Sequence, residues 1–372
     1  MVKWYYFTCN YIKKLIDNPA NMPADIMEIL KERKMTKICA PMVRYSKLQF
    51  RTLVRRYDCD ICFTPMIMAD SFVQSAEARN NDFVINKADD PLIVQFAAKC
   101  VEDFVCAAEM IAPYSNGVDL NCGCPQRWAI KDGYGVDLLH RPQVVKELVT
   151  QIRNRIPVPF TVSVKIRLLK DIRKTIEFCR ILEKAGASFL TVHARTPQMR
   201  NEPIDLNGLK MVRDCVQLPL IANGNVKTLE EAEMLYQESN CEGIMAANGI
   251  LTNPAMFSGY STTPMSCVQD WLNITSNIPT PFLCMHHHLV FMLEKILPKA
   301  ERRIFNNLQD RTSVLEFLDK YYGLRPTICD NSLEPTTCHY NPSLIKKVFN
   351  STHDIKEIQY PDDILGNIFL EQ

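Results

Sequence analysis

Hydrophobic residues in this chain form short runs that alternate with longer stretches of helical periodicity. The longer stretches include Arg141 to Ile156, with Pro142 in its first turn, and Ile172 to Ala185, which Gly186 ends. Thr228 is placed to cap a further helix. The short runs predict eight strands, at residues 37–42, 60–64, 91–97, 117–121, 159–165, 187–193, 219–222 and 243–247.

The order of these elements indicates the fold class. Eight strand and helix alternations over roughly 220 residues match an α/β fold of the (β/α)8 TIM barrel type, whereas an open doubly wound sheet rarely contains so many. After residue 260 the strands stop, and amphipathic helices are predicted at Cys267 to Ile274, Phe282 to Leu297 and Arg302 to Tyr322. The sequence therefore predicts an N-terminal extension at 1–35, a barrel domain at 36–260, a small C-terminal all-helical domain at 261–322 and a tail of unassigned role at 323–372.

Composition and charge narrow the class of protein. With 47% hydrophobic residues and a formal net charge of +1, the 372-residue chain fits a soluble globular protein, and a nucleic-acid partner would need a local basic face. The 15 cysteines lack disulfide-like spacing and no clear signal peptide is present, so we expect an intracellular protein, most simply cytoplasmic, with the nucleus as the alternative. No apolar run reaches the roughly 18 residues that span a membrane. No metal is expected, because His286-His287-His288 on one helix point in different directions.

Polar and glycine residues gather where the predicted strands end. In barrels of this type the chemistry collects at the carboxyl ends of the strands. Packing alone does not account for so many polar positions at one rim, so a cofactor site is expected there. The positions, in strand order, are Pro41-Met42-Val43, Gln95, Asn121 to Cys124, Lys165 and Arg167, His193 and Arg195, Asn223-Gly224-Asn225, and Ala247-Asn248-Gly249.

These positions favour a flavin with a phosphate group. The loops after strands seven and eight often bind phosphate, and the glycines of Asn223-Gly224-Asn225 and Ala247-Asn248-Gly249 let backbone N–H groups approach it. Lys165 at an inward-facing strand end needs an anionic partner, which a reduced flavin supplies near N1. Gln95 and His193 would bond the polar edge of the ring, with Pro41-Met42-Val43 beneath it. Taken singly, a core histidine and a packing methionine remain open as alternatives.

The segment Asn121-Cys122-Gly123-Cys124-Pro125 presents thiols in a tight turn. Gly123 permits the turn, and Pro125 biases Cys124 towards an extended conformation. A thiol presented there can donate a proton. Two buried packing cysteines are the alternative that the motif alone leaves open.

Several motifs in order give the chain a resemblance to the tRNA-dihydrouridine synthase family, nearest to its eukaryotic dihydrouridine synthase 4-like branch. The resemblance extends from about residue 37 to about residue 322. It implies an FMN-dependent enzyme that reduces the C5–C6 double bond of D-loop uridines in tRNA, at positions 20a and 20b for this branch, with NADPH or NADH restoring the reduced flavin. The motifs are Ala40-Pro41-Met42-Val43, Gln95-Phe96, Asn121 to Pro125, Lys165-Ile166-Arg167, Val192 to Thr196, and Ala222-Asn223-Gly224.

The resemblance also implies residue roles. Hydride passes from flavin N5 to C6 of the uracil, and Cys124 protonates C5 from the opposite face. Cys122 does not match the position of the acid, and is expected either to pack in the core or to support the residues that contact the ligand. Asn121 and Arg195 match positions that hold the uracil edge. The loop with Arg127 and Lys131 is expected to order over the substrate, with Gly133 and Gly135 as hinges. Phosphates of the extruded nucleotide would meet basic side chains, namely Arg167, Lys170, Arg173, Lys174, Lys295, Lys299, Arg302 and Arg303.

Two positions depart from the family pattern. Asn248-Gly249 stands where relatives commonly carry Arg-Gly, which removes a cation from the expected phosphate loop, and Ala194 stands where many carry glycine. Two other functions stay open: a flavin-dependent dehydrogenase of a free pyrimidine, and a tRNA-binding relative with weak catalysis. Bound flavin in the purified protein separates the last of these from an enzyme.

Overall fold

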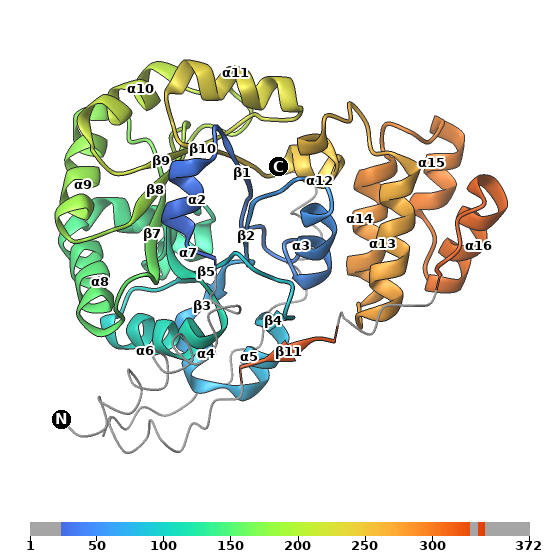
Figure 1. Cartoon of the computed structure of the whole chain (residues 1–372), viewed down its shortest axis with the longest axis horizontal. Coiled ribbons are helices and arrows are strands. Elements are labelled where there is room, and N and C mark those ends of the chain that lie inside the picture. Colours follow the sequence, from blue (N-terminus) through green and yellow to red (C-terminus); the bar gives the residue numbers. More distant parts are fainter. Residues whose placement is uncertain (1–23, 328–333, 339–372) are drawn as a thin grey trace.

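The computed structural model describes residues 24–327 and 334–338, in which eight parallel strands close into a barrel (Figure 1). Neighbouring strands follow in chain order, and the barrel closes because β10 pairs with β1 and β2 with β5. All eight predicted strands are confirmed, with ends that differ by up to three residues. They are β1 (Thr36–Cys39), β2 (Ile61–Phe63), β5 (Leu92–Ala97), β6 (Gly117–Cys122), β7 (Thr161–Arg167), β8 (Phe189–His193), β9 (Leu220–Asn223) and β10 (Gly243–Ala246).

Helices form the outer layer of the barrel (Figure 1). Pro142 begins α8, and the Thr228 hydroxyl accepts a hydrogen bond from the Glu231 amide at 3.2 Å, as the end signals predict. Gly186 follows α9 with φ +91, a conformation that glycine adopts at little cost. The helices of this layer are α3 (Leu48–Arg55), α4 (Ala69–Gln74), α5 (Ala76–Asp82), α6 (Val101–Ile111), α7 (Arg127–Lys131), α8 (Pro142–Arg155), α9 (Ile172–Lys184), α10 (Leu206–Cys215), α11 (Leu229–Ser239) and α12 (Asn248–Thr252).

Segments from both predicted flanking regions attach to the barrel. Helix α2 (Ile26–Glu32) buries Ile26 and Leu30 in the core. The Asn116 amide, just before β6, donates to the Ala24 carbonyl at 2.8 Å, so the start of α2 lies against the N-terminal ends of strands. Near the other terminus, β11 (Thr336–Thr337) pairs antiparallel with β4 (Val84–Ile85). Residues 1–23, 328–333 and 339–372 of the two predicted flanks lie outside the described residues.

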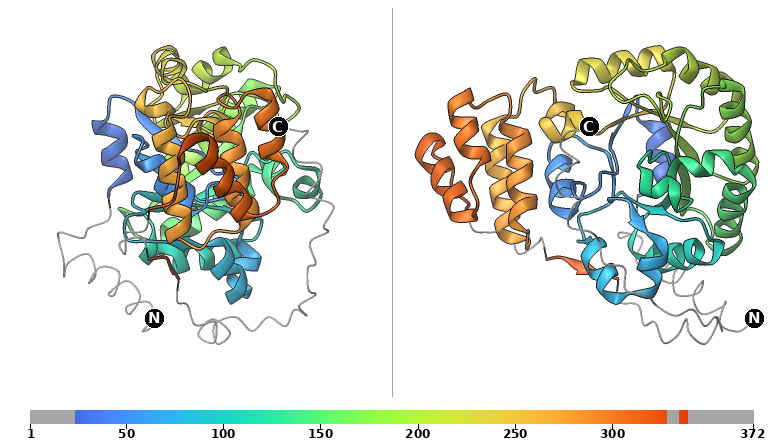
Figure 2. Two further views of the ribbon diagram at one scale, coloured as in Figure 1. Left: turned by 90° about the vertical axis from the view of Figure 1, so that its right-hand side faces the viewer. Right: turned by 180° about the vertical axis from the view of Figure 1, so that it is seen from behind.

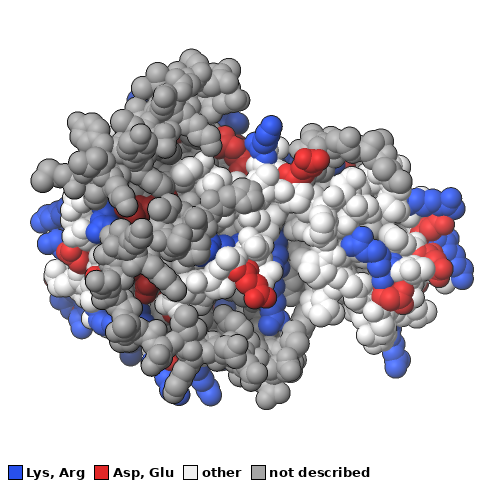
Figure 3. Space-filling view, turned by 90° about the horizontal axis from the view of Figure 1, so that it is seen from below, with Lys and Arg blue, Asp and Glu red and all other residues white. Residues whose placement is uncertain are grey.

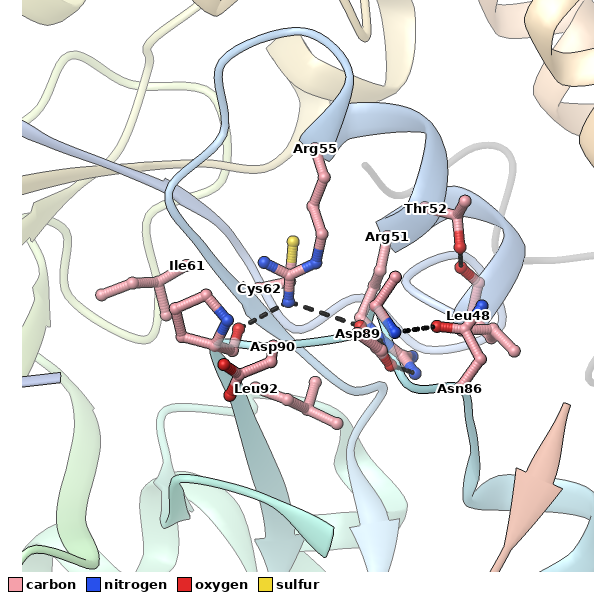
Figure 4. Close-up of polar contacts among 12 residues, drawn as sticks. Leu48, Arg51, Thr52, Arg55, Ile61, Cys62, Asn86, Asp89, Asp90 and Leu92 are labelled. Carbon is pink, nitrogen blue, oxygen red and sulfur yellow. Dashed lines mark hydrogen bonds and ion pairs between the residues drawn. The ribbon is translucent and has the colours of Figure 1, made fainter. Parts of the chain in front are cut away.

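A buried ion pair joins α3 to the segment before β5 (Figure 4). Arg51 donates through Nε to the two Asp89 carboxylate oxygens at 3.1 and 3.0 Å. Arg55 reaches the same carboxylate with Nη2 at 3.3 Å. Arg51 is 1% exposed and Asp89 5%, so each charge depends on the other for the solvation that water no longer provides.

A unit of four helices stands beside the barrel, next to α3 and α12 (Figures 1 and 2). The prediction of one helix from Arg302 to Tyr322 is wrong: α15 ends at Asn306, and Asp310 caps α16 by accepting from the Ser313 amide at 2.9 Å. The unit consists of α13 (Met265–Asn277), α14 (Phe282–Leu293), α15 (Lys299–Asn306) and α16 (Arg311–Tyr322). No helix in the described part of the chain is long and apolar enough to cross a membrane.

His288 lies in the contact between this unit and the barrel. Its ring stacks on Phe50 of α3 with centroids 4.6 Å apart and lies 4.6 Å from the ring of Trp271. All three side chains are buried, and burial lowers the pKa of His288 to about 3. This histidine is therefore a neutral packing residue, and no cluster of metal-ligating side chains occurs within residues 24–327 and 334–338.

Candidate active site

The upper interior of the barrel is polar, although the layers inside such barrels are usually filled by bulky apolar side chains. Gln95, Asp119 and Ser163 lie in register on β5, β6 and β7. The next level contains Asn121 and Lys165, also in register. Burial of polar groups is costly unless they are hydrogen-bonded, so this many at one end of the barrel indicates a site for a polar ligand.

The lower of these levels centres on Asp119. Its carboxylate accepts from Gln95 Nε2 at 2.8 Å and from the Ser163 hydroxyl at 2.6 Å. Gln95 Oε1 in turn accepts from Asn121 Nδ2 at 2.9 Å. Burial raises the pKa of Asp119 to about 6, against the opposing effect of these hydrogen bonds and of the Lys165 charge.

Lys165 makes one hydrogen bond, to a neutral amide, and no ion pair with a carboxylate within the described residues. Its ammonium donates to Asn223 Oδ1 at 3.0 Å, and Asn223 is held by a bond from its Nδ2 to the Met245 carbonyl at 2.8 Å. Burial lowers the pKa of Lys165 to about 8, and the Arg167 charge adds to the decrease. The acidic side chain that opposes this, Asp119, already binds Gln95 and Ser163. The anionic edge of a cofactor therefore fits at this ammonium.

His193 and Arg195 follow at the end of β8. Burial lowers the pKa of His193 to about 2, and the charges of Lys165, Arg167 and Arg195 act in the same direction, so the ring is neutral. Arg195 is 8% exposed and donates through Nε to the Glu202 carbonyl at 2.6 Å. Its Nη1 lies 3.5 Å from His193 Nε2, which places both side chains at one point of the rim.

The two loops expected to bind phosphate touch each other. A Cβ at Gly249 would lie 2.2 Å from the carbonyl oxygen of Val226, so only glycine permits this approach. Gly224 has φ +135 and Asn225 φ +58, which turn the backbone sharply after β9. Asn248 begins α12 with its side chain exposed. Beside these loops lies a cavity of about 190 Å³, whose lining includes Lys227 on the barrel and Lys295 on the helical unit.

The Cys124 turn is fixed by contacts from several elements. Asn121 Oδ1 accepts from the amides of Gly123 and Cys124 at 3.1 and 3.0 Å. Arg167 Nε donates to the Gly123 carbonyl at 3.1 Å, and the Val136 amide to the Cys124 carbonyl at 3.1 Å. Arg167 also donates to the Thr196 and Met199 carbonyls, so this guanidinium, expected at a phosphate, links the turn to the loop after β8.

The Cys124 thiol is partly buried against Ala97, Ala129 and Tyr134. Burial raises its pKa above the ordinary value, opposed by a hydrogen bond from the Gln126 backbone and by the charges of Arg167 and Lys165. The thiol thus keeps its proton at neutral pH, which a proton donor requires. Cys122 is fully buried in the main core, which agrees with the packing role expected for it.

The other predicted site residues are more dispersed. Met42 is buried, Pro41 is partly buried, and Val43 is 49% exposed after β1, whereas Ala247 is partly buried between β10 and α12. Arg127 and Lys131 on α7 and Arg303 on α15 are exposed. Arg302 on α15 is half-buried and donates through Nη1 to the Glu294 carbonyl at 2.6 Å. Asp119 and Ser163 were not predicted; a charged residue inside an apolar strand run was the available signal.

Comparison with known proteins gives a consistent family match. A family model described as dihydrouridine synthase matches residues 38–323. A mouse protein named tRNA-dihydrouridine(20a/20b) synthase (NAD(P)+)-like is 48% identical over 80% of this chain and 93% of its own length. Its human counterpart is 45% identical over 81% and 95%, and the Schizosaccharomyces pombe tRNA-dihydrouridine(20a/20b) synthase 41% over 82% and 93%. The old yellow enzyme of Trypanosoma cruzi superposes on 59% of this chain and 85% of its own, with TM-score 0.45 and 11% identity.

Proposed function

The chain belongs to the dihydrouridine synthase family, and on that premise we propose that it reduces uridines of tRNA to dihydrouridine with a bound flavin and NAD(P)H. We further propose that the flavin is FMN and that the targets are D-loop uridines at 20a and 20b, since the similar mouse, human and yeast proteins carry those positions in their names. The observation that carries the proposal is a protonated Cys124 thiol in a fixed turn beside the Lys165 cation.

The residues present fit a flavin. Lys165 would hold the anionic edge of the ring, and Gln95 and neutral His193 retain capacity to bond its polar edge. Pro41, Met42 and Val43, which follow β1, would provide the contacts to the ring that the sequence predicts. When bound, the reduced flavin supplies the hydride that C6 of uracil receives. The backbone of the two touching loops, Asn223 to Asn225 and Ala247 to Gly249, would hold the phosphate.

Cys124 completes the reduction from the other face of the base. Its S–H bond breaks as the proton passes to C5, the thiolate regains a proton from solvent, and one hydrogen has then been added at each end of the double bond. Asn121 has one Nδ2 hydrogen left for a uracil oxygen, because the other goes to Gln95 and Oδ1 serves the turn. Arg195 offers further donors at the same rim.

The RNA must bring an unstacked uridine to this rim, because C5 and C6 are inaccessible in a stacked base. We assign flavin binding and catalysis to residues 36–260 and phosphate contacts to the helical domain at 261–322. In that assignment Arg127 and Lys131 bind the RNA close to the base, and Arg302 and Arg303 bind more distant phosphates.

The proposal is tested with purified protein, NADPH and two substrates. Incubation with an unmodified tRNA transcript should form dihydrouridine at 20a and 20b, whereas free uridine should stay unreduced, since it lacks the phosphates that provide the affinity. Visible absorbance of the protein should show bound flavin, and the released cofactor should be identified by mass as FMN. Reduction of the free pyrimidine alone would replace this proposal by a small-molecule dehydrogenase, and absence of flavin would leave an RNA-binding protein.

A further inference from the structure

A chain of hydrogen bonds links the buried Asp119 to the turn that carries Cys124. Gln95 Nε2 donates to Asp119 Oδ2 at 2.8 Å, and Asn121 Nδ2 donates to Gln95 Oε1 at 2.9 Å. Asn121 Oδ1 then accepts from the amides of Gly123 and Cys124 at 3.1 and 3.0 Å. This series of hydrogen bonds starts at a carboxylate, passes through two amide side chains, on β5 and β6, and ends at two backbone N–H groups.

The two ends of this chain allow one orientation of both amides. An ionised carboxylate only accepts and a backbone N–H only donates, whereas a primary amide can turn either face to a neighbour. An acceptor at Asp119 requires Gln95 to present its NH₂, which leaves Gln95 Oε1 to accept from Asn121. Asn121 must then present its oxygen to the turn. The carboxylate thereby makes the far amide bind the turn rather than repel it.

We propose that Asp119 is a positioning residue, which fixes the orientation of the Gln95 and Asn121 amides and through them the Cys124 turn. The inference rests on the proposed function for the part that Cys124 plays in catalysis, but the hydrogen-bond chain exists in the protein alone. In the proposed complex Asp119 contacts neither the thiol nor the uracil, so its effect on the Cys124 turn is carried by the two amides. Its charge also acts on Lys165, an effect that Asp119→Asn removes without removing the acceptor.

The burial of Asp119 argues against a passive packing role. Its side chain is 0% exposed inside the barrel, where an apolar residue of similar size usually stabilises more than a charged one. Each polar contact of its carboxylate is directed: Ser163 occupies one oxygen and Gln95 the other. The raised pKa of Asp119, about 6, reflects the same desolvation.

Three variants separate orientation from charge and from packing. Asp119→Leu removes the acceptor and keeps the branching of the side chain, with two methyl groups in place of the two oxygens. Asp119→Asn keeps an acceptor for Gln95 and turns its NH₂ to the Ser163 hydroxyl, which can accept as well as donate. Thr191→Val is the matched control, since the Thr191 hydroxyl is buried in the same barrel interior, is 0% exposed and has no hydrogen-bond partner within the described residues.

Amide hydrogen exchange of the peptide that contains Gly123 and Cys124 is measured by mass spectrometry, together with steady-state reduction of tRNA. In Asp119→Leu the two amides should exchange at least about tenfold faster, because two hydrogen bonds are lost, while core peptides of α8 stay protected. The value of kcat should fall at least about tenfold with KM for tRNA within about twofold. Asp119→Asn and Thr191→Val should stay within about threefold of the unmodified protein in both measurements.

Unchanged protection of the turn in Asp119→Leu would overturn the proposal, as would equal loss in Asp119→Asn, which would assign the effect to charge. The exchange measurement needs no turnover, so it can be interpreted even if the protein does not reduce tRNA. If the unmodified protein reduces tRNA and Asp119→Leu keeps its kcat although its turn exchanges faster, the inference fails while the proposed function stands. Should Asp119→Leu not fold, Asp119→Val makes the same removal with a smaller residue suited to a strand.

Discussion

Burial at the barrel mouth sets the protonation states of single side chains in this protein. The same burial keeps the Cys124 thiol protonated and the His193 ring neutral, and it lowers the pKa of Lys165. Each of these states suits one task, respectively proton donation, neutral hydrogen bonding and reception of an anion. The electrostatic environment, rather than residue identity alone, thus distributes the roles.

The thiol of Cys124 is the first group to test. Cys124→Ala should lower dihydrouridine formation at least about a hundredfold, in the range expected for loss of a positioned acid, without changing flavin content or tRNA affinity. Single-turnover reduction of a tRNA transcript is the measurement. Cys122→Ala is the control, because it removes a buried thiol two residues away and should affect stability more than turnover. Normal turnover in Cys124→Ala would move the acid to another group.

Lys165 predicts the pH dependence of cofactor binding. Its pKa of about 8 in the free protein should rise once an anion binds, so the complex holds more protons than its parts above that pH. Affinity for the reduced flavin, the form that is anionic near N1, should therefore weaken as the pH rises beyond about 8, which anaerobic titration followed by the fluorescence of the protein will show. Lys165→Met should bind more weakly and lose this dependence. A pH-independent affinity in the unmodified protein would place the anion elsewhere.

The sequence predicted which residues belong to the candidate site where they stand at the end of a strand. It did not predict their hydrogen-bond partners. Lys165, His193 and Cys124 follow from their positions at strand ends. The acceptor for Gln95 could not be predicted, because it depends on the register that sets Gln95 beside Asp119. Arg167 was assigned to phosphate, but its donors reach three backbone carbonyls, which only loop geometry reveals.

At the scale of elements, the spacing of hydrophobic residues predicted the positions of the eight strands. The ends of the helices depend instead on the residues that cap them. The segment Arg302 to Tyr322 has an apolar pattern throughout. The helix nevertheless ends at Asn306, and a new one begins where the Asp310 carboxylate accepts from the Ser313 amide of α16. Period alone does not detect such a break. The short helix α7 and the extra strands also depend on tertiary contacts.

The loop after β6 should be sensitive to one methyl group. In Gly135→Ala the new Cβ would lie 2.4 Å from the Cys124 carbonyl oxygen, and φ +62 adds strain that is itself about 1–2 kcal/mol. We expect turnover to fall at least about tenfold because the turn must shift, as kinetics of tRNA reduction will measure.

Gly133→Ala is the matched control for this change. Its φ is +82, but the nearest atom to the new Cβ is the end of the flexible Arg141 side chain, at 2.9 Å. The control variant therefore has the same kind of backbone strain but no steric clash with the Cys124 carbonyl. Equal turnover in the two variants would show that the loop accommodates Gly135→Ala and that the close approach has no catalytic consequence.

At the scale of the whole molecule, charge gives no uniform attraction for RNA. Lys and Arg number 43 against 42 Asp and Glu. On the face seen in Figure 3, basic and acidic side chains are interspersed rather than gathered into one field. Binding of tRNA must therefore depend on particular cations, and the helical unit that stands beside the barrel (Figure 2) carries further ones on α15.

Arg302 and Arg303 on α15 test this arrangement. Reversal of both to Glu should weaken tRNA binding at least about tenfold at low salt and make the plot of log affinity against log salt shallower by about 1 to 2, since each phosphate contact releases roughly 0.7 to 0.9 counterions. Flavin content should not change, because the barrel is untouched. Filter binding over a salt series is the measurement.

Lys146→Glu with Lys184→Glu makes the same change in net charge on exposed positions of α8 and α9, across the barrel from the helical unit (Figure 1). Whole-molecule repulsion would weaken binding equally in both double variants, whereas local phosphate contacts weaken it in the α15 variant alone. If the α15 variant keeps its affinity and salt dependence, the RNA does not cross that helix. The cavity lined by Lys227 and Lys295, at the junction of the two units, then becomes the surface to examine by the same reversal.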